Sequence, residues 1–269
     1  MLAAIPFHTF PTLRLGPVPI HAFGAFVALG IVLGVWILTR FARQRGLDPD
    51  QLSSLAFWVV GLGILGARLL FVLTHLGDYA AEPLRVFALW EGGLQFSGSF
   101  LVAIVIVRWW LHRHPEVPGP VLLDGLTLAL APGLIVGRLG CIAVGEHLGN
   151  ETTFLLGWKY LGGETREGPL IVGSVVHSTA IYEALLLVPL AVLLFRLARR
   201  NLAPGTVAAT FFLWYGAQRF ATDVLRAYDR RVFGLTGAQY LAIGMAVAGL
   251  VAFRRIRARG AAGTPPSDA

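Results

Sequence analysis

Long apolar runs separated by short polar connectors make up most of this chain. Seven such runs lie near residues 21–39, 52–76, 94–111, 121–144, 178–195, 205–226 and 236–253. A transmembrane helix needs about 20 predominantly apolar residues to cross the hydrocarbon core of a bilayer. The pattern therefore predicts an all-α integral membrane protein with seven transmembrane helices. We expect residues 1–253 to form one membrane domain and the basic segment 254–269 to be a disordered cytoplasmic tail.

Arginines are concentrated in every second connector between these runs. The connectors after the first, third and fifth runs, and the tail, carry Arg40, Arg43, Arg45, Arg108, Arg113, Arg196, Arg199, Arg200, Arg254, Arg255, Arg257 and Arg259. Because basic residues flanking membrane helices favour the cytoplasmic side, the N-terminus is expected outside and the C-terminus in the cytoplasm. One connector departs from this rule, since Arg226, Arg230 and Arg231 follow the sixth run and fall outside.

The composition agrees with a membrane protein and disfavours other classes. The 269 residues are 56% hydrophobic and only 14% charged, with a mean hydropathy of +0.69, so a soluble globule of this size would lack the charge to solvate it. The net charge of +7 comes from arginines between apolar runs rather than along one face, which disfavours a nucleic-acid-binding protein. Cys141 is the only cysteine, so neither an intrachain disulfide nor a CxxC metal site can form.

Three arginines lie deep within the predicted helices. Arg68, Arg138 and Arg219 stand about 14 to 17 residues beyond the cytoplasmic starts of the second, fourth and sixth runs, or roughly 21 to 26 Å into the membrane. A lone arginine within a span costs at least about 2.5 kcal/mol. Three at one level therefore indicate either a shared polar site that binds an anion or snorkelling to the outer interface.

The residues around these arginines favour a phosphate-containing ligand. Arg219, Asp223 and Arg226 share one face of a helix, so the carboxylate can orient both guanidiniums, although a self-contained ion-pair ladder has the same spacing. In "WEGGLQFSG", Gly92 and Gly93 lie at an outer helix entrance where exposed amides can face a phosphate. The anion available at that depth is a phospholipid headgroup, which the planar guanidinium of arginine matches.

At these residues the chain resembles the bacterial phosphatidylglycerol:prolipoprotein diacylglyceryl transferases. The resemblance runs in order through "LGPVPIHAFG", "LGARLLF", "LWEGGLQFSG", "GRLGCIAVGEHLG", "HSTAIYE", "YGAQRFATDVLRAYD" and "QYLAIG", and covers nearly the whole chain apart from the tail. It implies a multi-pass enzyme of the bacterial inner membrane. Phosphatidylglycerol would supply a diacylglyceryl group to the lipobox cysteine of a preprolipoprotein, a thioether would form, and glycerol phosphate would leave. The resemblance implies no metal or other cofactor.

The resemblance also assigns site residues. The essential signature arginine of the family falls on Arg138, and the arginine before the acid of the sixth span falls on Arg219. That acid is Asp223 here, where glutamate is usual, and the next arginine is Arg226. Further matching positions are Arg68, Gly92, Gly93, Glu146, Gly149, His177, Tyr182 and Glu183. We expect Arg138 and Arg219 to be catalytic, and the phospholipid headgroup to be bound by Arg68, Gly92, Gly93, Arg138, Gly149, Arg219, Asp223 and Arg226.

Three positions depart from the family pattern. Phe23 stands where tyrosine is expected, Ser97 where histidine is expected, and Cys141 where asparagine is expected. Two groups that could handle protons and one amide are therefore missing. Because the thiol of the substrate must ionise to react, His21 and Glu146 are the candidate general bases. Cys141 is interpreted as a small buried apolar residue rather than a nucleophile.

Other functions remain open from the sequence. A divergent relative that binds phospholipid without transferring its diacylglyceryl group is compatible with the departures. A transporter is compatible with arginines buried in the spans. A retinal-type protein is excluded, because the sole lysine, Lys159, lies in a predicted exterior loop and no span can carry a Schiff base.

Overall fold

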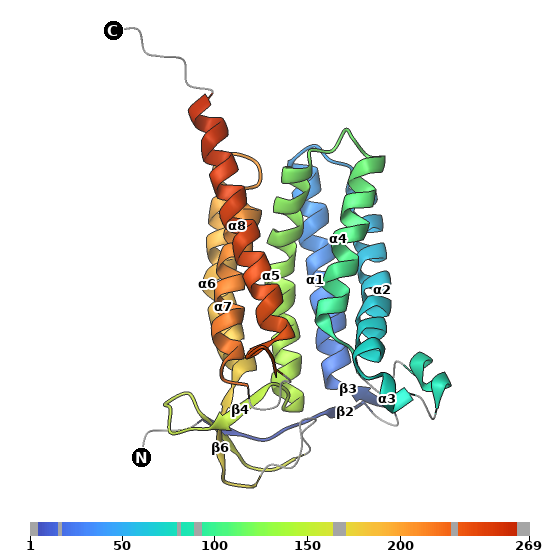
Figure 1. Ribbon diagram of the computed structural model, residues 1–269, viewed down its shortest axis with the longest axis vertical. Helices are drawn as coiled ribbons and strands as arrows, with labels where there is room; N and C mark the ends of the chain where they lie inside the picture. The colour runs from blue at the N-terminus through green and yellow to red at the C-terminus, as the bar shows by residue number, and fades with distance from the viewer. Residues whose placement is uncertain are drawn as a thin grey trace. The chain divides into compact units, whose positions relative to one another are not determined.

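Seven long helices dominate the computed structural model, which describes residues 5–15, 18–79, 82–88, 93–163, 171–226 and 231–262 (Figure 1). They are α1 (Ala22–Gln44), α2 (Pro49–Thr74), α4 (Phe96–Arg113), α5 (Gly119–Val144), α6 (Thr179–Ala198), α7 (Thr206–Asp223) and α8 (Gly237–Ala262). Each covers one of the predicted apolar runs. The prediction of a mostly helical chain is therefore confirmed.

Four of these helices, α1, α2, α5 and α6, are long and apolar enough to cross a membrane. The sequence of α7 includes polar residues that are buried inside the protein, among them Gln218 and Asp223. Such residues lower the average hydropathy of a helix without exposing charge to lipid. The chain is therefore a multi-pass membrane protein built from helices.

Short strands accompany the helices, although the sequence analysis predicted none. A four-stranded sheet has the order β1 (Ile5–Phe7), β5 (Trp158–Tyr160), β6 (Val175–Ser178) and β4 (Leu148–Glu151). Two hairpins pair β2 (Thr12–Leu15) with β3 (Val18–His21) and β7 (Arg231–Val232) with β8 (Leu235–Thr236). Strands of two to four residues are too short to show a period-two pattern in the sequence. The remaining short elements are α3 (Leu76–Tyr79) and the 3₁₀ helix η1 (Pro83–Phe87).

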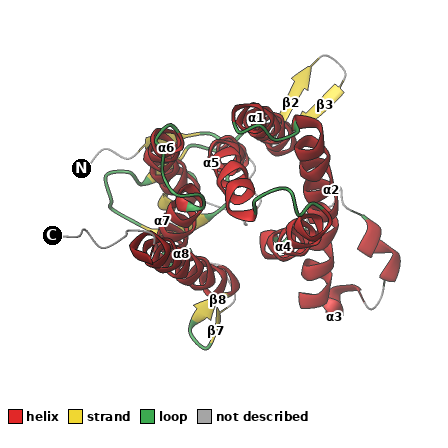
Figure 2. Ribbon diagram, turned by 90° about the horizontal axis from the view of Figure 1, so that it is seen from above, coloured by secondary structure: helices red, strands yellow, loops and turns green. Residues whose placement is uncertain are grey.

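The chain divides into two compact units, one formed by Met1–Ile37 with Leu123–Ala269 and the other by Leu38–Leu122. In the first unit α6, α7 and α8 lie next to one another (Figure 2). Glycines allow their close approach, because a Cβ added at Gly216 of α7 would lie only 2.6 Å from the Ala242 carbonyl oxygen of α8. Helix α7 therefore packs closely against α8 on one side and contacts α6 as well.

A buried carboxylate caps the start of α7. Gly205, the residue before this helix, offers no side chain to the free amides of the first turn. Asp124 of α5 takes that role, since one carboxylate oxygen accepts from the Gly205 amide and the other from the Ala208 amide, each at 2.8 Å. A carboxylate at a helix N-terminus is stabilised by the unpaired amides and by the helix dipole. This residue was not singled out in the sequence.

The last helix extends beyond the predicted end of the membrane domain. The sequence predicted disorder from residue 254, but α8 remains helical to Ala262. Arginine and alanine are strong helix formers, so a helix already established in "MAVAGLVAF" continues through "RRIRAR" at little cost. Residues 263–269 lie outside the described part of the chain.

In the second unit, α2 and α4 cross at a pair of glycines. A Cβ added at Gly66 would lie 2.9 Å from the Gly98 carbonyl oxygen, and one added at Gly98 would overlap the Gly66 carbonyl oxygen. Next to this crossing, the Ser99 hydroxyl donates to the Gly63 carbonyl oxygen at 2.8 Å. The backbones approach closely because the residues that face each other at the crossing are glycines, with Val102 of α4 and Leu70 of α2 packed beside them.

We predict that Gly98→Ala lowers the stability of the protein by about 1 to 3 kcal/mol, because the added methyl group forces the two backbones apart. Gly61→Ala on α2 is the matched control, since a Cβ there has no atom within 4 Å. Thermal unfolding of both variants in the same detergent measures the difference. Equal melting temperatures for the two variants would contradict this account of the crossing.

Candidate active site

One buried carboxylate holds two arginines from different helices. Glu183 of α6 has no solvent-exposed surface. One of its oxygens, Oε2, lies 2.5 Å from Nη2 of Arg138 on α5, and the other, Oε1, is ion-paired with Nη1 of Arg219 on α7. A buried charge is tolerated when it is paired and hydrogen-bonded. Glu183 therefore fixes the two guanidiniums side by side.

Polar side chains of α7 fix Glu183 in turn. The Thr222 hydroxyl donates to Oε1 of Glu183 at 3.2 Å, and the Gln218 side-chain amide donates to the Glu183 backbone carbonyl at the same distance. Trp214 completes the chain of contacts by donating its indole N–H to the Gln218 side-chain oxygen at 3.2 Å. These hydrogen bonds hold the carboxylate in place, and the arginines paired with it are held in turn.

A second buried carboxylate connects Arg219 to Arg226. Asp223, also without exposed surface, lies 3.1 Å from Nη2 of Arg219 and 3.5 Å from Nη1 of Arg226, and accepts a hydrogen bond from the Thr236 hydroxyl. The predicted pairing of this acid with both arginines is confirmed. Arg226, however, lies beyond the end of α7 at Asp223, rather than on the same helical face. We call Arg138, Arg219, Arg226, Glu183 and Asp223 the arginine cluster.

The two charge types of the arginine cluster differ in exposure. Both carboxylates are completely buried, whereas the three arginine side chains keep 12 to 14% of their surface exposed. The solvent contact of the arginine cluster therefore comes from its arginine side chains and not from its carboxylates. Such an arrangement binds an anion with directed hydrogen bonds. The pairing of Glu183 depends on tertiary packing, because its partners come from α5 and α7, whereas Asp223 pairs with arginines close to it in the sequence.

The segment after α5 brings His147 to the arginine cluster. Nη2 of Arg226 lies 2.7 Å from Nδ1 of His147, and because a guanidinium can only donate, Nδ1 is the acceptor. Gly149 pairs with Arg226 in an isolated bridge, and a Cβ at Gly149 would overlap the Leu225 carbonyl oxygen. The glycine expected to bind the headgroup therefore serves this close backbone contact.

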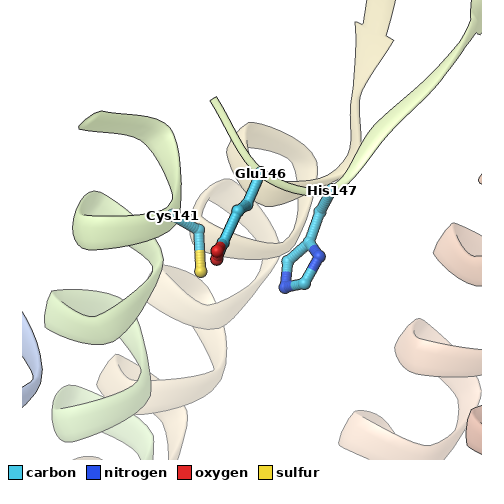
Figure 3. A group of neighbouring side chains, drawn as sticks. All are labelled: Cys141, Glu146 and His147. Carbon is cyan, nitrogen blue, oxygen red and sulfur yellow. The ribbon is translucent and has the colours of Figure 1, made fainter. Parts of the chain in front are cut away.

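Cys141, Glu146 and His147 form a small polar group beside the arginines (Figure 3). Their potential ligand atoms lie within 4.8 Å of one another, and thiolate, carboxylate and imidazole are residue types that bind transition metals. Arg138, however, directs Nη1 to the Cys141 sulfur at 3.8 Å, and Arg226 occupies Nδ1 of His147. Two guanidiniums in contact with the group oppose a bound cation and favour an anion.

His177 and Tyr182 form a separate polar contact near the start of α6. Nδ1 of His177 lies 2.9 Å from the Tyr182 hydroxyl, which donates to the Leu156 carbonyl oxygen at 3.3 Å. Partial burial lowers the pKa of His177 because the charged imidazolium loses hydration. The lowered pKa favours the neutral imidazole, and Tyr182 connects His177 to the loop that contains Leu156.

Arg68 has a different environment from the other two deep arginines. It belongs to the second compact unit, is buried, and donates to the backbone carbonyls of Arg85 at 2.5 Å, Val86 at 2.9 Å and Gly93 at 3.3 Å. Gly93 has a positive φ of 72°, and a Cβ there would lie 2.6 Å from the Phe71 ring. Arg68 therefore fixes the backbone of the segment that was expected to meet the phosphate. Gly92 lies outside the described residues.

The remaining candidates are His21, Phe23 and Ser97. His21 is exposed at the end of β3, and within the described part of the chain no hydrogen bond or ion pair joins it to the arginine cluster. Phe23 packs against Ala143 and Val144, with its Cα 3.4 Å from the position of a Cβ at Gly140. Ser97 is half-buried in the first turn of α4.

Comparison with known proteins identifies the family. A family profile described as prolipoprotein diacylglyceryl transferase matches residues 11–255. Similar proteins, each called phosphatidylglycerol–prolipoprotein diacylglyceryl transferase, include one from Symbiobacterium thermophilum that is 33% identical over 242 residues, covering 89% of each chain. Another from Geobacter sulfurreducens is 33% identical over 88% of this chain and 91% of its own. A third, from Halalkalibacterium halodurans, is 31% identical over 93% of this chain and 87% of its own. The chain belongs to the prolipoprotein diacylglyceryl transferase family.

Proposed function

We propose that this protein transfers the diacylglyceryl group of phosphatidylglycerol to the lipobox cysteine of preprolipoproteins. The observation that carries the proposal is the pair of guanidiniums that Glu183 holds together at the accessible edge of a buried polar cluster. The two substrates, phosphatidylglycerol and a prolipoprotein, are inferred from the names of the relatives. The lipid bilayer supplies phosphatidylglycerol directly to a site between membrane helices.

In this reaction the substrate sulfur attacks the glyceryl carbon that is bonded to the phosphate oxygen. A carbon–sulfur bond forms, the carbon–oxygen bond breaks, and the phosphate oxygen leaves with its electron pair as glycerol phosphate. Arg138 and Arg219 bind the phosphate and stabilise the charge that grows on the leaving oxygens, as positioned donors do in other transferases. Arg226 and Asp223 hold Arg219 in place.

The thiol proton needs an acceptor, since a cysteine with a pKa of about 8.5 is mostly protonated near pH 7. Glu146 is the preferred base because its carboxylate lies in the polar group next to the arginine cluster. His21, exposed on β3, is the second candidate. Arg68 fixes the segment before α4 by donating to the Gly93 carbonyl oxygen. Gly149 allows the backbone of Arg226 to approach closely.

We further propose that all seven long helices cross the inner membrane, with the N-terminus outside and the C-terminus in the cytoplasm. The support is the alternation of arginine-rich connectors. Arg138 then lies about 28 Å from the cytoplasmic start of α5 at Gly119, at the outer side of the bilayer. The headgroups of the outer leaflet lie at the same level.

Reporter fusions test this orientation. A reporter after Arg259 should give a cytoplasmic signal, and one inserted after Val172, an exposed residue between β5 and β6, should give a periplasmic signal. Green fluorescent protein and alkaline phosphatase at each position provide opposite readouts. Reversal of both signals would place the arginine cluster at the cytoplasmic side and contradict the proposed supply of substrate.

Rescue of a bacterium depleted of its own transferase tests the activity. The wild-type gene should restore growth and lipoprotein modification. Arg138→Lys should lower the transfer rate about 100-fold or more, because an ammonium cannot make two parallel hydrogen bonds to a phosphate. Arg113→Lys, an exposed arginine at the end of α4, is the matched control at equal protein levels. Wild-type protein that is inserted in the membrane but gives no rescue would favour a phospholipid-binding relative without transfer activity.

Glu183→Gln tests how the two arginines are held together. Removing this charge takes away the ion-pair partner of Arg138 and leaves Arg219 with Asp223 alone, and breaking a buried pair costs about 3 to 5 kcal/mol of stability. The double variant Glu183→Gln with Arg219→Gln should recover part of that stability but no activity. Glu116→Gln, on an exposed loop, is the control. Full activity in Glu183→Gln would show that the arginines do not need the carboxylate.

A further inference from the structure

A groove lies on α5 and α6, away from the arginine cluster. Its volume is about 400 Å³, and it is lined by Ile135, Val188, Ala191, Val192, Phe195, Arg196 and Arg199. All of these residues belong to the first compact unit. Arg196 is 13 residues along α6 from Glu183, or about 20 Å, so the groove is separate from the arginine cluster.

The lining of the groove is amphipathic along its length. Val188, Val192 and Phe195 form an apolar stripe at helical spacing, and Arg196 and Arg199 follow at the end of α6. Both arginines are exposed, and within the described residues no ion pair or hydrogen bond joins either guanidinium to an acidic side chain. The groove thus offers an apolar wall at membrane depth and two free cationic groups at one end.

We propose that this groove binds an anionic glycerophospholipid, with an acyl chain along the apolar stripe and the phosphate at Arg196 and Arg199. Arginines at the end of a membrane helix can serve only to set its orientation, but that role does not require a groove lined by the same arginines. A soluble phosphate would make no use of the apolar wall, and a zwitterionic lipid would bring an ammonium group toward the guanidiniums. Basic sites between membrane helices match the charge of anionic headgroups.

The lipid in the groove is held rather than consumed. No carboxylate or thiol lines the groove, so a bound lipid meets no group that could accept a proton. In the proposed orientation the arginines lie at the cytoplasmic end of α6, so the lipid belongs to the inner leaflet. The inference therefore goes beyond the proposed transfer reaction, which uses lipid at the opposite end of the helix.

Native mass spectrometry of the full-length protein with added dioleoyl phosphatidylglycerol tests the proposal, with dioleoyl phosphatidylcholine as the zwitterionic comparison. Wild type should retain one more phosphatidylglycerol than the Arg196→Ala/Arg199→Ala variant. The affinity for that lipid should fall roughly 30-fold. Arg200→Ala is the matched control, because this neighbouring exposed arginine does not line the groove.

A second pair of variants tests the apolar wall. Val192→Trp fills the groove and should also remove one bound lipid, whereas Leu186→Trp changes a similarly exposed residue of α6 outside the groove and should not. The proposal is overturned if phosphatidylcholine binds equally well, if the double arginine variant keeps its lipid, or if Arg200→Ala loses as much. Rescue by the double arginine variant should equal that of wild type. The lipid count remains informative even if wild type shows no transfer activity.

Discussion

The contact between Glu183 and two arginines determines how the rest of this site is built. A carboxylate without solvent contact must be neutralised, and here the neutralising groups come from α5 and α7 while the carboxylate comes from α6. Three helices are thereby tied at one point by charge. Both carboxylates of the arginine cluster are fully buried, whereas the three arginine side chains keep 12 to 14% of their surface exposed. The same contact that stabilises the helices therefore leaves cationic rather than anionic side chains partly exposed.

Close packing makes that contact possible. Glycines bring α7 against α8, and Asp124 fixes the start of α7 by accepting from two of its free amides. Asp124 of α5 therefore fixes the N-terminal end of the helix whose C-terminal half carries Arg219. In the second unit, Arg68 donates its N–H groups to the backbone carbonyls of Arg85 and Val86 and so fixes the conformation of that segment. Arginines of similar predicted depth thus have different physical roles.

The sequence predicts the helices well and the site only in part. Long apolar runs define where the seven long helices lie, whereas strands of two to four residues leave no periodic signal, and helix propensity carries α8 past residue 254. The pairing of Arg219 with Asp223 follows from their spacing on one helix. Glu183 could be matched to the family but not given a partner, because its partners are set by packing between helices. Likewise, nothing in "LGARLLF" indicates that Arg68 donates to carbonyls about 20 residues later.

The central claim is that a phosphate bound by Arg138 and Arg219 leaves as glycerol phosphate when a thiol attacks the glyceryl carbon. The purified protein in vesicles of phosphatidylglycerol, given a peptide with one lipobox cysteine, measures this directly. Mass spectrometry follows the peptide, and an enzymatic assay follows released glycerol phosphate. The account predicts one glycerol phosphate for each peptide that gains a diacylglyceryl thioether. Glycerol phosphate released without peptide modification, or a correctly inserted protein that forms neither product, would contradict it.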